Sequence, residues 1–98
     1  MGSERAARSR IEVEAEGDGF RVRVDDGASR TSHFVTVSAE EQARYGPATD
    51  LRHLVEESFR FLLEREPAAA ILPRFALSAI ERYFPEYPEE IRRRLGGR

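Results

Sequence analysis

The chain is 98 residues long, carries a net charge of −2 and contains 40% hydrophobic and 35% charged residues, which fits a single folded domain. It has no cysteine, which excludes disulfides and thiolate chemistry, and it has no apolar run of about 18 residues that could span a membrane. No segment near the start has the character of a signal peptide, so we expect a cytoplasmic protein without a membrane partner.

All 16 basic residues are arginine, and most of them stand beside acidic residues. The absence of lysine and asparagine, whose codons are AT-rich, is typical of a GC-rich bacterial genome. No segment is strongly basic, and this charge pattern argues against a nonspecific nucleic-acid binder.

The first nine residues, MGSERAARS, are small, polar or basic. Such a terminus has little apolar surface to hold it against a core, so we expect residues 1–9 to be a disordered tail. Residues 10–95 are predicted to form one α+β domain, and residues 96–98 a second short tail.

Residues 10–16 and 19–25 alternate between apolar and charged side chains on either side of a Gly-Asp-Gly turn, which predicts a β-hairpin. The simplest register sets Ile11 opposite Val24 and Val13 opposite Val22 on one face. The same register sets glutamates of the first strand opposite arginines of the second on the other face, where each pair contributes a few tenths of a kcal/mol.

Residues 31–38 predict a third strand, rich in threonine and valine. Val35 and Val37 continue the apolar face of the hairpin, whereas Phe34 and Thr36 fall on the charged face. Phe34 is therefore expected either to be an exposed aromatic side chain or to be covered by the C-terminal tail.

Two helices are predicted after this strand. Ser38 and Glu41 match a capping box, which starts a short helix over residues 39–45. Residues 47–66, PATDLRHLVEESFRFLLERE, then predict one long helix, with Pro47 at its first position and Asp50 in its first turn. Pro67 ends it.

The apolar side chains of this long helix cover an arc of about 200° on a helical wheel, whereas a surface helix needs a stripe only a little over 100° wide. The helix is therefore expected to be covered on two flanks. The sheet covers one of them. The other is covered either by short C-terminal helices or by a second chain.

Residues 67–84 admit two interpretations. The favoured one is a pair of short helices that close the core, the second starting with a capping box of Ser78 and Glu81 and ending at Pro85. The other is a helix-turn-helix that binds DNA and exposes Arg82. Pro73 inside the would-be first helix and the lack of glycine in the turn argue against it.

No residue pattern indicates catalysis. His53 and Glu57 stand four apart on a helix, a spacing that can hold a metal, but no third ligand follows and a solvated face is favoured. His33 fits a strand-end histidine with a backbone partner. No serine lies in a G-x-S-x-G motif and no glycine-rich phosphate loop occurs. We therefore predict no catalytic, cofactor-binding or metal-binding residue and no cofactor.

The stretch from Phe59 to Tyr87 contains the sequences FRFLLEREP and RYFPEY. It resembles small uncharacterised bacterial proteins. No activity is attached to these proteins, so the resemblance implies no functional residue.

We therefore expect a three-stranded antiparallel meander packed on a long central helix, with short C-terminal helices. The predicted function is a non-catalytic protein-interaction module that acts by homodimerisation or by binding a partner protein. Exposed tyrosine and arginine are typical of protein–protein hot spots. The candidate contact residues are Phe34, Phe61, Arg82, Tyr83 and Tyr87.

Two alternatives stay open. One is a small nucleic-acid-associated regulator of the antitoxin type, with Arg92, Arg93 and Arg94 as candidate phosphate contacts. These arginines also suit i,i+4 pairs with Glu89 and Glu90 at the end of a helix. The third reading is an enzyme whose site is not visible in the sequence.

Overall fold

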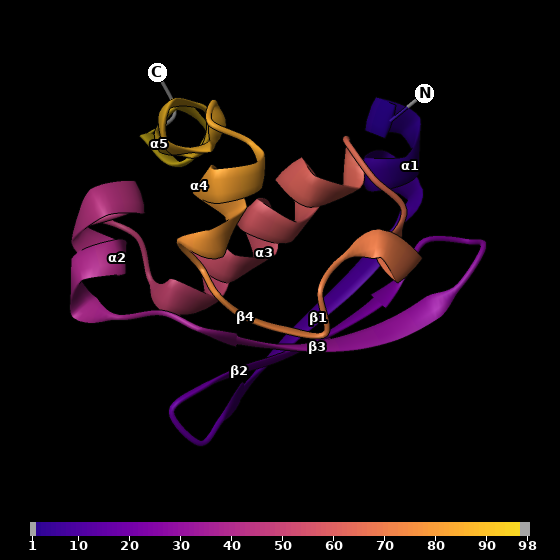
Figure 1. Ribbon diagram of the computed structural model, residues 1–98, viewed down its shortest axis with the longest axis horizontal. Helices are drawn as coiled ribbons and strands as arrows, with labels where there is room; N and C mark the ends of the chain where they lie inside the picture. The colour runs from indigo at the N-terminus through magenta and orange to yellow at the C-terminus, as the bar shows by residue number, and fades with distance from the viewer. Residues whose placement is uncertain (1, 97–98) are drawn as a thin grey trace.

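A four-stranded mixed sheet carries the helices on one side in the computed structural model, which describes residues 2–96 (Figure 1). The strand order is β1-β2-β3-β4; β1, β2 and β3 pair antiparallel, and β4 pairs parallel with β3. The predicted α+β class is confirmed. In chain order the elements are α1 (Gly2–Arg8), β1 (Arg10–Glu16), β2 (Gly19–Asp25), β3 (Arg30–Thr36), α2 (Ala39–Tyr45), α3 (Leu51–Leu63), the 3-10 turn η1 (Ala68–Ala70), β4 (Arg74–Ala76), α4 (Ala79–Tyr83) and α5 (Tyr87–Gly96).

The hairpin of β1 and β2 has the predicted register, with Glu14 opposite Arg21 and Glu12 opposite Arg23 on the outer face. The ion pairs, however, run diagonally: Arg21 bonds Glu16 at 2.9 Å and Arg23 bonds Glu14 at 3.0 Å. Each arginine thus bonds the glutamate that lies two residues nearer the turn than the one directly opposite it. A diagonal neighbour lies within reach of so long a side chain. The inner face carries the apolar pairs Ile11 with Val24, Val13 with Val22 and Ala15 with Phe20.

The fourth strand corrects the three-stranded meander expected from the sequence. β4 lies beside β3, where the Phe34 N–H donates to the Pro73 carbonyl at 2.8 Å and the Leu77 N–H donates to the Thr36 carbonyl at 3.0 Å. Pro73 stands at the strand's entry, where its missing N–H costs no ladder bond. The helix-turn-helix interpretation of residues 67–84 is wrong, because this stretch holds η1, β4 and only one α-helix.

Helix α3 is shorter than the predicted range of residues 47–66. It begins at Leu51 and ends at Leu63. Asp50 is the N-cap rather than a residue of the first turn, since its carboxylate accepts the His53 N–H at 2.8 Å. A capping carboxylate satisfies an N–H that the helix itself cannot, and here it sets the start of the helix in place of Pro47.

The wide apolar arc of α3 is buried as predicted, and elements of the same chain cover it. The sheet lies under the helix, and α1, α4 and α5 lie beside or above it (Figure 1). The buried residues of the arc are Leu54, Val55, Ser58, Phe59, Phe61, Leu62 and Leu63. Within residues 2–96, no side of α3 therefore needs a second molecule.

The N-terminal segment differs from the disordered tail expected over residues 1–9. From Gly2 to Arg8 it forms helix α1, which packs on α3 with Ala6 buried. Arg5 Nε donates to the Leu63 carbonyl at 2.9 Å, and the Arg60 guanidinium donates to the Ala6 carbonyl at 3.0 Å. These long-range bonds, which no local sequence pattern reveals, hold the segment. Of the second expected tail, Gly96 ends α5 and residues 97 and 98 lie outside the described part of the chain.

One of the two predicted capping boxes is confirmed. Ser38 and Glu41 satisfy each other's backbone N–H groups at the start of α2. Ser78 makes no side-chain cap bond. Its N–H instead donates to the second carboxylate oxygen of Glu41 at 2.9 Å, and Glu81 accepts bonds from Arg44 and Tyr45. The glutamate of the expected second box therefore joins α4 to α2.

Candidate functional site

Phe34 lies on the outer face of the sheet, as predicted, yet only 7% of it is exposed. Its ring lies between the guanidinium groups of Arg21 and Arg74, 5.5 and 4.6 Å from the ring centroid. The ring also rests against the backbone of Gly19, where an added Cβ would approach the Phe34 ring to 2.8 Å. Arginines of β2 and β4, rather than the C-terminal tail, thus cover this aromatic side chain, which is not an exposed anchor.

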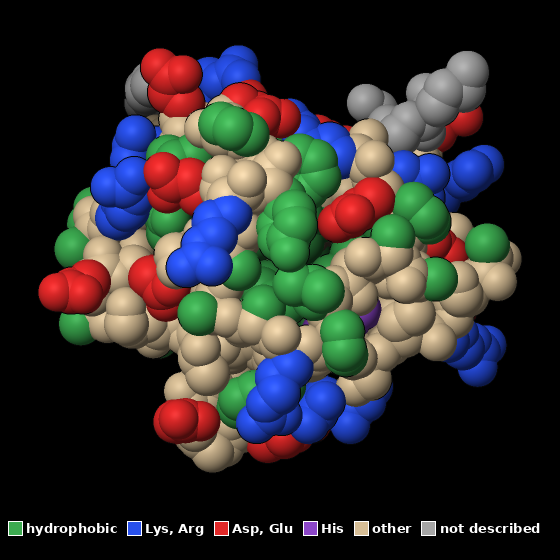
Figure 2. All heavy atoms as spheres, viewed as in Figure 1, with side chains coloured by type: hydrophobic (Ala, Val, Ile, Leu, Met, Phe, Trp, Pro, Cys, Tyr) green, Lys and Arg blue, Asp and Glu red, His purple; other side chains and the backbone are tan. Residues whose placement is uncertain are grey.

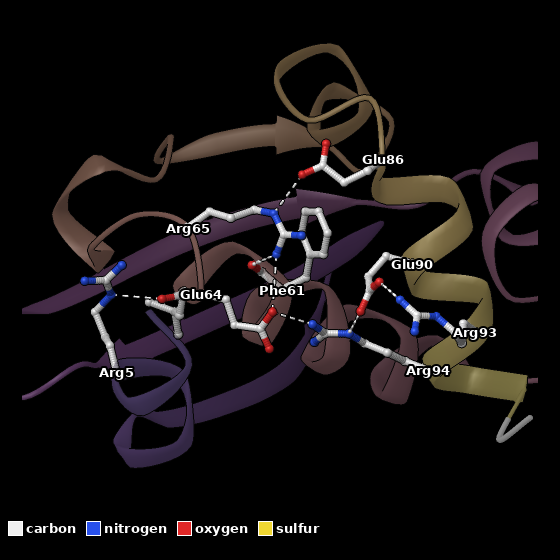
Figure 3. Close-up of polar contacts among 9 residues, drawn as sticks. Arg5, Phe61, Glu64, Arg65, Glu86, Glu90, Arg93 and Arg94 are labelled. Carbon is white, nitrogen blue, oxygen red and sulfur yellow. Dashed lines mark hydrogen bonds and ion pairs between the residues drawn. The ribbon is translucent and has the colours of Figure 1, made fainter. Parts of the chain in front are cut away.

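Phe61, a second candidate contact, is fully buried in the core. The Arg65 guanidinium lies 3.6 Å above its ring and bonds Glu86 at 2.9 Å (Figure 3). The rings of Phe84 and Tyr87 meet its edges at centroid distances of 5.9 and 5.2 Å. This cluster joins the end of α3 to α5, so Phe61 stabilises the fold and offers no surface to a partner.

Tyr87 is also buried rather than exposed. Its hydroxyl lies 2.6 Å from Ser58 Oγ, and its ring packs on Tyr45 at a centroid distance of 4.9 Å. Burial raises the pKa of the Tyr87 phenol well above its usual value. Tyr87 is the first residue of α5, and both Tyr87 and Pro88 are buried, against the expectation that flanking prolines and charges would keep Tyr87 at the surface.

The candidate phosphate contacts of α5 all have partners within the chain. Arg92 donates to the Arg44 carbonyl at 2.9 Å, Arg93 bonds Glu90, and Arg94 bonds both Glu90 and Glu64 (Figure 3). The hydrogen bond from Arg94 lowers the pKa of the Glu90 carboxyl. Arg92 and Arg94 thus hold α5 to α2 and to the end of α3, and a phosphate would have to compete with a carboxylate or a carbonyl at each of the three guanidinium groups.

Tyr83 and its neighbour Arg82, both on α4, are the predicted contact residues that the structure leaves exposed. Tyr83 is 65% exposed, and Leu72 on the loop before β4 is 43% exposed. Among residues 2–96 these are the exposed large hydrophobic side chains, and both line the same concavity, of about 120 Å³. Figure 2 shows hydrophobic side chains gathered around this place, between α4 and η1.

We call this concavity the α4 hollow. Leu62 at the end of α3 and Ile80 on α4 form part of its lining, and both are buried. Two of the side chains that line it are small, Ala70 on η1 and Ala79 on α4. Its walls are therefore fixed by the core, whereas Leu72 and Tyr83 stand at its rim.

A buried histidine holds the loop that carries Leu72. His33 Nδ1 lies 2.7 Å from the Leu72 carbonyl, and its Nε2 lies 2.8 Å from Thr31 Oγ1. Because a carbonyl only accepts, Nδ1 carries the proton and Nε2 accepts from the threonine hydroxyl. Burial lowers the pKa of His33, which favours this neutral form. The predicted backbone partner of His33 is confirmed, but His33 lies in the middle of β3 and not at a strand end.

Glu66 brings a carboxyl group to the rim of the hollow. Burial raises the pKa of this carboxyl, with a smaller opposing effect of the Arg5 charge. In the part of the chain that the structure describes, Glu66 forms no ion pair, in contrast to its neighbours Glu64 and Arg65. A carboxylate beside an apolar surface that forms no ion pair within the chain is suited to a cation from outside.

Sequence reasoning found Tyr83 and Arg82 but missed Leu72 and Glu66. Leu72 stands next to Ile71, which is buried, and no periodicity distinguishes the two. Glu66 was assigned to the long helix, but α3 ends three residues earlier. Both residues lie on the connection between the end of α3 and the start of β4. A correct prediction of the last residue of α3 would have placed them on a surface loop, where connections between elements usually run.

Within residues 2–96, no group of three or more histidine, cysteine or acidic side chains is placed to hold a metal ion. None of the helices in that range combines the length and the apolar character needed to cross a membrane. His53 and Glu57, the pair considered for a metal, lie on the side of α3 that is not buried.

No protein-family model matches the chain, and none of the curated proteins or solved structures compared with it matches either. The resemblance of the Phe59–Tyr87 stretch to small bacterial proteins stays a prediction. The function is therefore inferred from the geometry and chemistry of the surface itself.

Proposed function

We propose that the protein is a non-catalytic protein-interaction module and that it docks another protein surface at the α4 hollow. The observation that carries this proposal is the convergence of Leu72 and Tyr83 on one concavity with an apolar floor. Single exposed apolar side chains are common on protein surfaces. Two of them at one hollow with a mainly apolar lining are more typical of an interaction site.

The residue types also fit a docking role. Tyrosine is among the side chains that dominate binding energy in protein interfaces, because it combines a large apolar ring with a hydroxyl group. Tyr83 is the most exposed large hydrophobic side chain among the residues described. Glu66 at the rim adds a charge that discriminates between partners, since a cation opposite it is favoured and an acid is repelled.

The chemistry of the hollow favours binding over catalysis. Of its lining residues only Glu66 and Tyr83 can ionise, and neither has a hydrogen-bonded nucleophile or base beside it among the residues described. General acid–base or nucleophilic catalysis needs a second group within hydrogen-bond reach. A nucleic-acid role finds less support, because the helix-turn-helix is not formed and the arginines of α5 are paired.

Site-specific photo-cross-linking tests the proposal. A photoreactive phenylalanine analogue replaces Tyr83 in one variant and Glu12 in a control; Glu12 is exposed on the outer face of the sheet, away from the helices. In cells that express the variants, the analogue at position 83 is expected to yield a defined protein adduct, identified by mass spectrometry. The analogue at position 12 is expected to yield none above background.

Binding to the identified protein is then measured with purified components. Tyr83→Ala is expected to weaken it at least about 30-fold, the effect of losing a hot-spot side chain. Glu12→Ala serves as the matched control and should leave the affinity unchanged. Cross-linking at position 83 no stronger than at position 12, or an affinity that Tyr83→Ala does not change, would refute the proposal.

A further inference from the structure

The α4 hollow and the side chain best suited to fill it stand next to each other on the same molecule. Tyr83 projects from α4 with 65% of its surface exposed, and it lies on the rim of a hollow of about 120 Å³. Space of this order accepts one aromatic ring, since a cavity of about 150 Å³ binds benzene. A projection beside a matching recess is self-complementary when two copies face each other across a two-fold axis.

The charges around the hollow repeat this arrangement. Arg82 precedes Tyr83 and is exposed, and it forms no ion pair within residues 2–96. Glu66 lines the hollow and also forms no ion pair among the residues described, although the Arg5 charge acts on it. The other arginines between residues 67 and 96 contact Phe34 or bond acidic or carbonyl groups. One unpaired cation thus accompanies the projecting ring, and one unpaired carboxylate accompanies the recess.

We infer that the occupant of the α4 hollow is a second copy of this chain. Tyr83 of each copy enters the hollow of the other, and Arg82 of each copy pairs with Glu66 of the other. This inference rests on the proposed docking function and names its partner. Two identical ring insertions and two identical ion pairs then form across one two-fold axis, which is the commonest symmetry of homodimers.

The expected size of this contact sets its strength. A standard interface covers about 800 Å² on each partner, roughly a seventh of the 5806 Å² surface of this chain. The hollow alone is smaller, so the contact extends along α4 and over the exposed alanines of η1, Ala69 and Ala70. An interface at the low end of the size range forms a reversible dimer, and we expect a dissociation constant of order micromolar.

Sedimentation velocity across the micromolar range tests the inference with charge-swap variants. Glu66→Arg places two arginines at each contact of the dimer, and Arg82→Glu places two glutamates there. Either substitution, like Tyr83→Ala, is expected to weaken the dimer at least about tenfold for each of the two contacts it alters. The double variant Glu66→Arg/Arg82→Glu restores opposite charges at both contacts and is expected to dimerise again.

A mixture of the two single variants provides an independent readout. One copy then carries arginine at both positions and the other carries glutamate at both, so the heterodimer is expected to form although neither variant self-associates. Matched charge reversals on the outer face of the sheet, Glu12→Arg and Arg23→Glu, should leave association unchanged. Circular dichroism and thermal melts establish that each variant is folded; the altered side chains at the hollow are exposed or half-buried.

Each negative result has a distinct meaning. A wild-type chain that stays monomeric at all concentrations overturns the inference but leaves the proposed docking of a different protein, which the cross-linking at position 83 decides. A dimer that Glu66→Arg, Arg82→Glu and Tyr83→Ala do not weaken overturns the assignment of the hollow. A dimer that the single variants weaken, and that neither the double variant nor the mixture restores, overturns the pairing of Arg82 with Glu66.

Discussion

The hydroxyl groups of Ser58 and Tyr87 form a buried pair between α3 and α5, and its proton positions follow from the geometry. Ser58 Oγ lies 2.7 Å from the Leu54 carbonyl, which can only accept, so the serine proton points there. Tyr87 Oη, 2.6 Å from Ser58 Oγ, must then donate to it. Both side chains are fully buried, so water cannot replace either partner.

This order of donors predicts unequal effects of removing each hydroxyl. Tyr87→Phe removes one donor while Ser58 keeps its bond to Leu54, so it should lower the free energy of unfolding by about 1 kcal/mol. Ser58→Ala leaves the tyrosine O–H buried without an acceptor and should cost about 1–3 kcal/mol. The double variant has no unsatisfied O–H left. Its cost should therefore fall short of the sum of the single costs by about 1 kcal/mol.

Urea unfolding of the four proteins, analysed with a shared slope, measures these differences from the shifts in midpoint. Tyr83→Phe is the matched control: it removes the same hydroxyl from an exposed side chain and should change stability by less than about 0.5 kcal/mol. Strictly additive costs of Ser58→Ala and Tyr87→Phe would show that the two hydroxyls do not interact. A Tyr87→Phe variant as stable as wild type would show that Tyr87 Oη is solvated.

Three further predictions concern the sheet. Gly19→Ala should lower the free energy of unfolding, measured by urea titration, by about 1–3 kcal/mol. The reason is that the added Cβ would approach the Val35 carbonyl oxygen to 2.5 Å. A variant as stable as wild type would contradict this close approach. Because the pKa of His33 is lowered in the folded chain, the unfolded chain binds a proton first as the pH falls. The free energy of unfolding is therefore highest above about pH 6.5 and decreases below it, until the pH reaches the pKa of the folded state. The slope is at most about 1.4 kcal/mol per pH unit. An NMR titration of His33 with an unshifted midpoint would refute this. Asp26 accepts the Ala68 N–H at 2.8 Å, so Asp26→Ala should leave that amide buried and unpaired and cost about 1–3 kcal/mol; faster hydrogen exchange at Ala68 than in wild type is the expected sign, and an unchanged rate would argue against the bond.

The parts of the fold that the sequence predicts are those specified by residues close to one another along the chain. Alternation over residues 10–25 fixes the hairpin register, because a slip by one residue would turn every valine outward. Ser38 and Glu41 are three residues apart, and their capping box forms as predicted. The 3.6-residue period of α3 likewise identifies its buried side chains, although not its first and last residues.

The parts that the sequence does not predict depend on partners far along the chain. β4 has only three residues, too few to alternate, and becomes a strand because β3 offers it a free edge. Glu81 has the spacing of a capping glutamate but bonds Tyr45, 36 positions away in the sequence. Phe34 is covered by Arg74, and Phe61 and Tyr87 are buried against aromatic rings from distant elements, which no hydropathy pattern encodes. Of the predicted contact residues, only Arg82 and Tyr83 remain at the surface.

The closure of α3 changes the argument for a partner. From the arc of about 200° alone, the second flank of α3 could be buried either by C-terminal helices or by a second chain. In the second case a dimer would have been needed to complete the hydrophobic core. The structure covers the arc with the sheet, α1, α4 and α5, and the exposed apolar surface lies elsewhere, at the α4 hollow. Tyr83 is not needed to complete the core, since most of its ring is already in water. Folding and association are therefore separable in this chain: Tyr83→Ala should abolish docking at the hollow while the free energy of unfolding stays within about 0.5 kcal/mol of wild type. A large loss of stability in that variant would mean that Tyr83 supports the fold, and the physical basis for a docking surface would be lost with it.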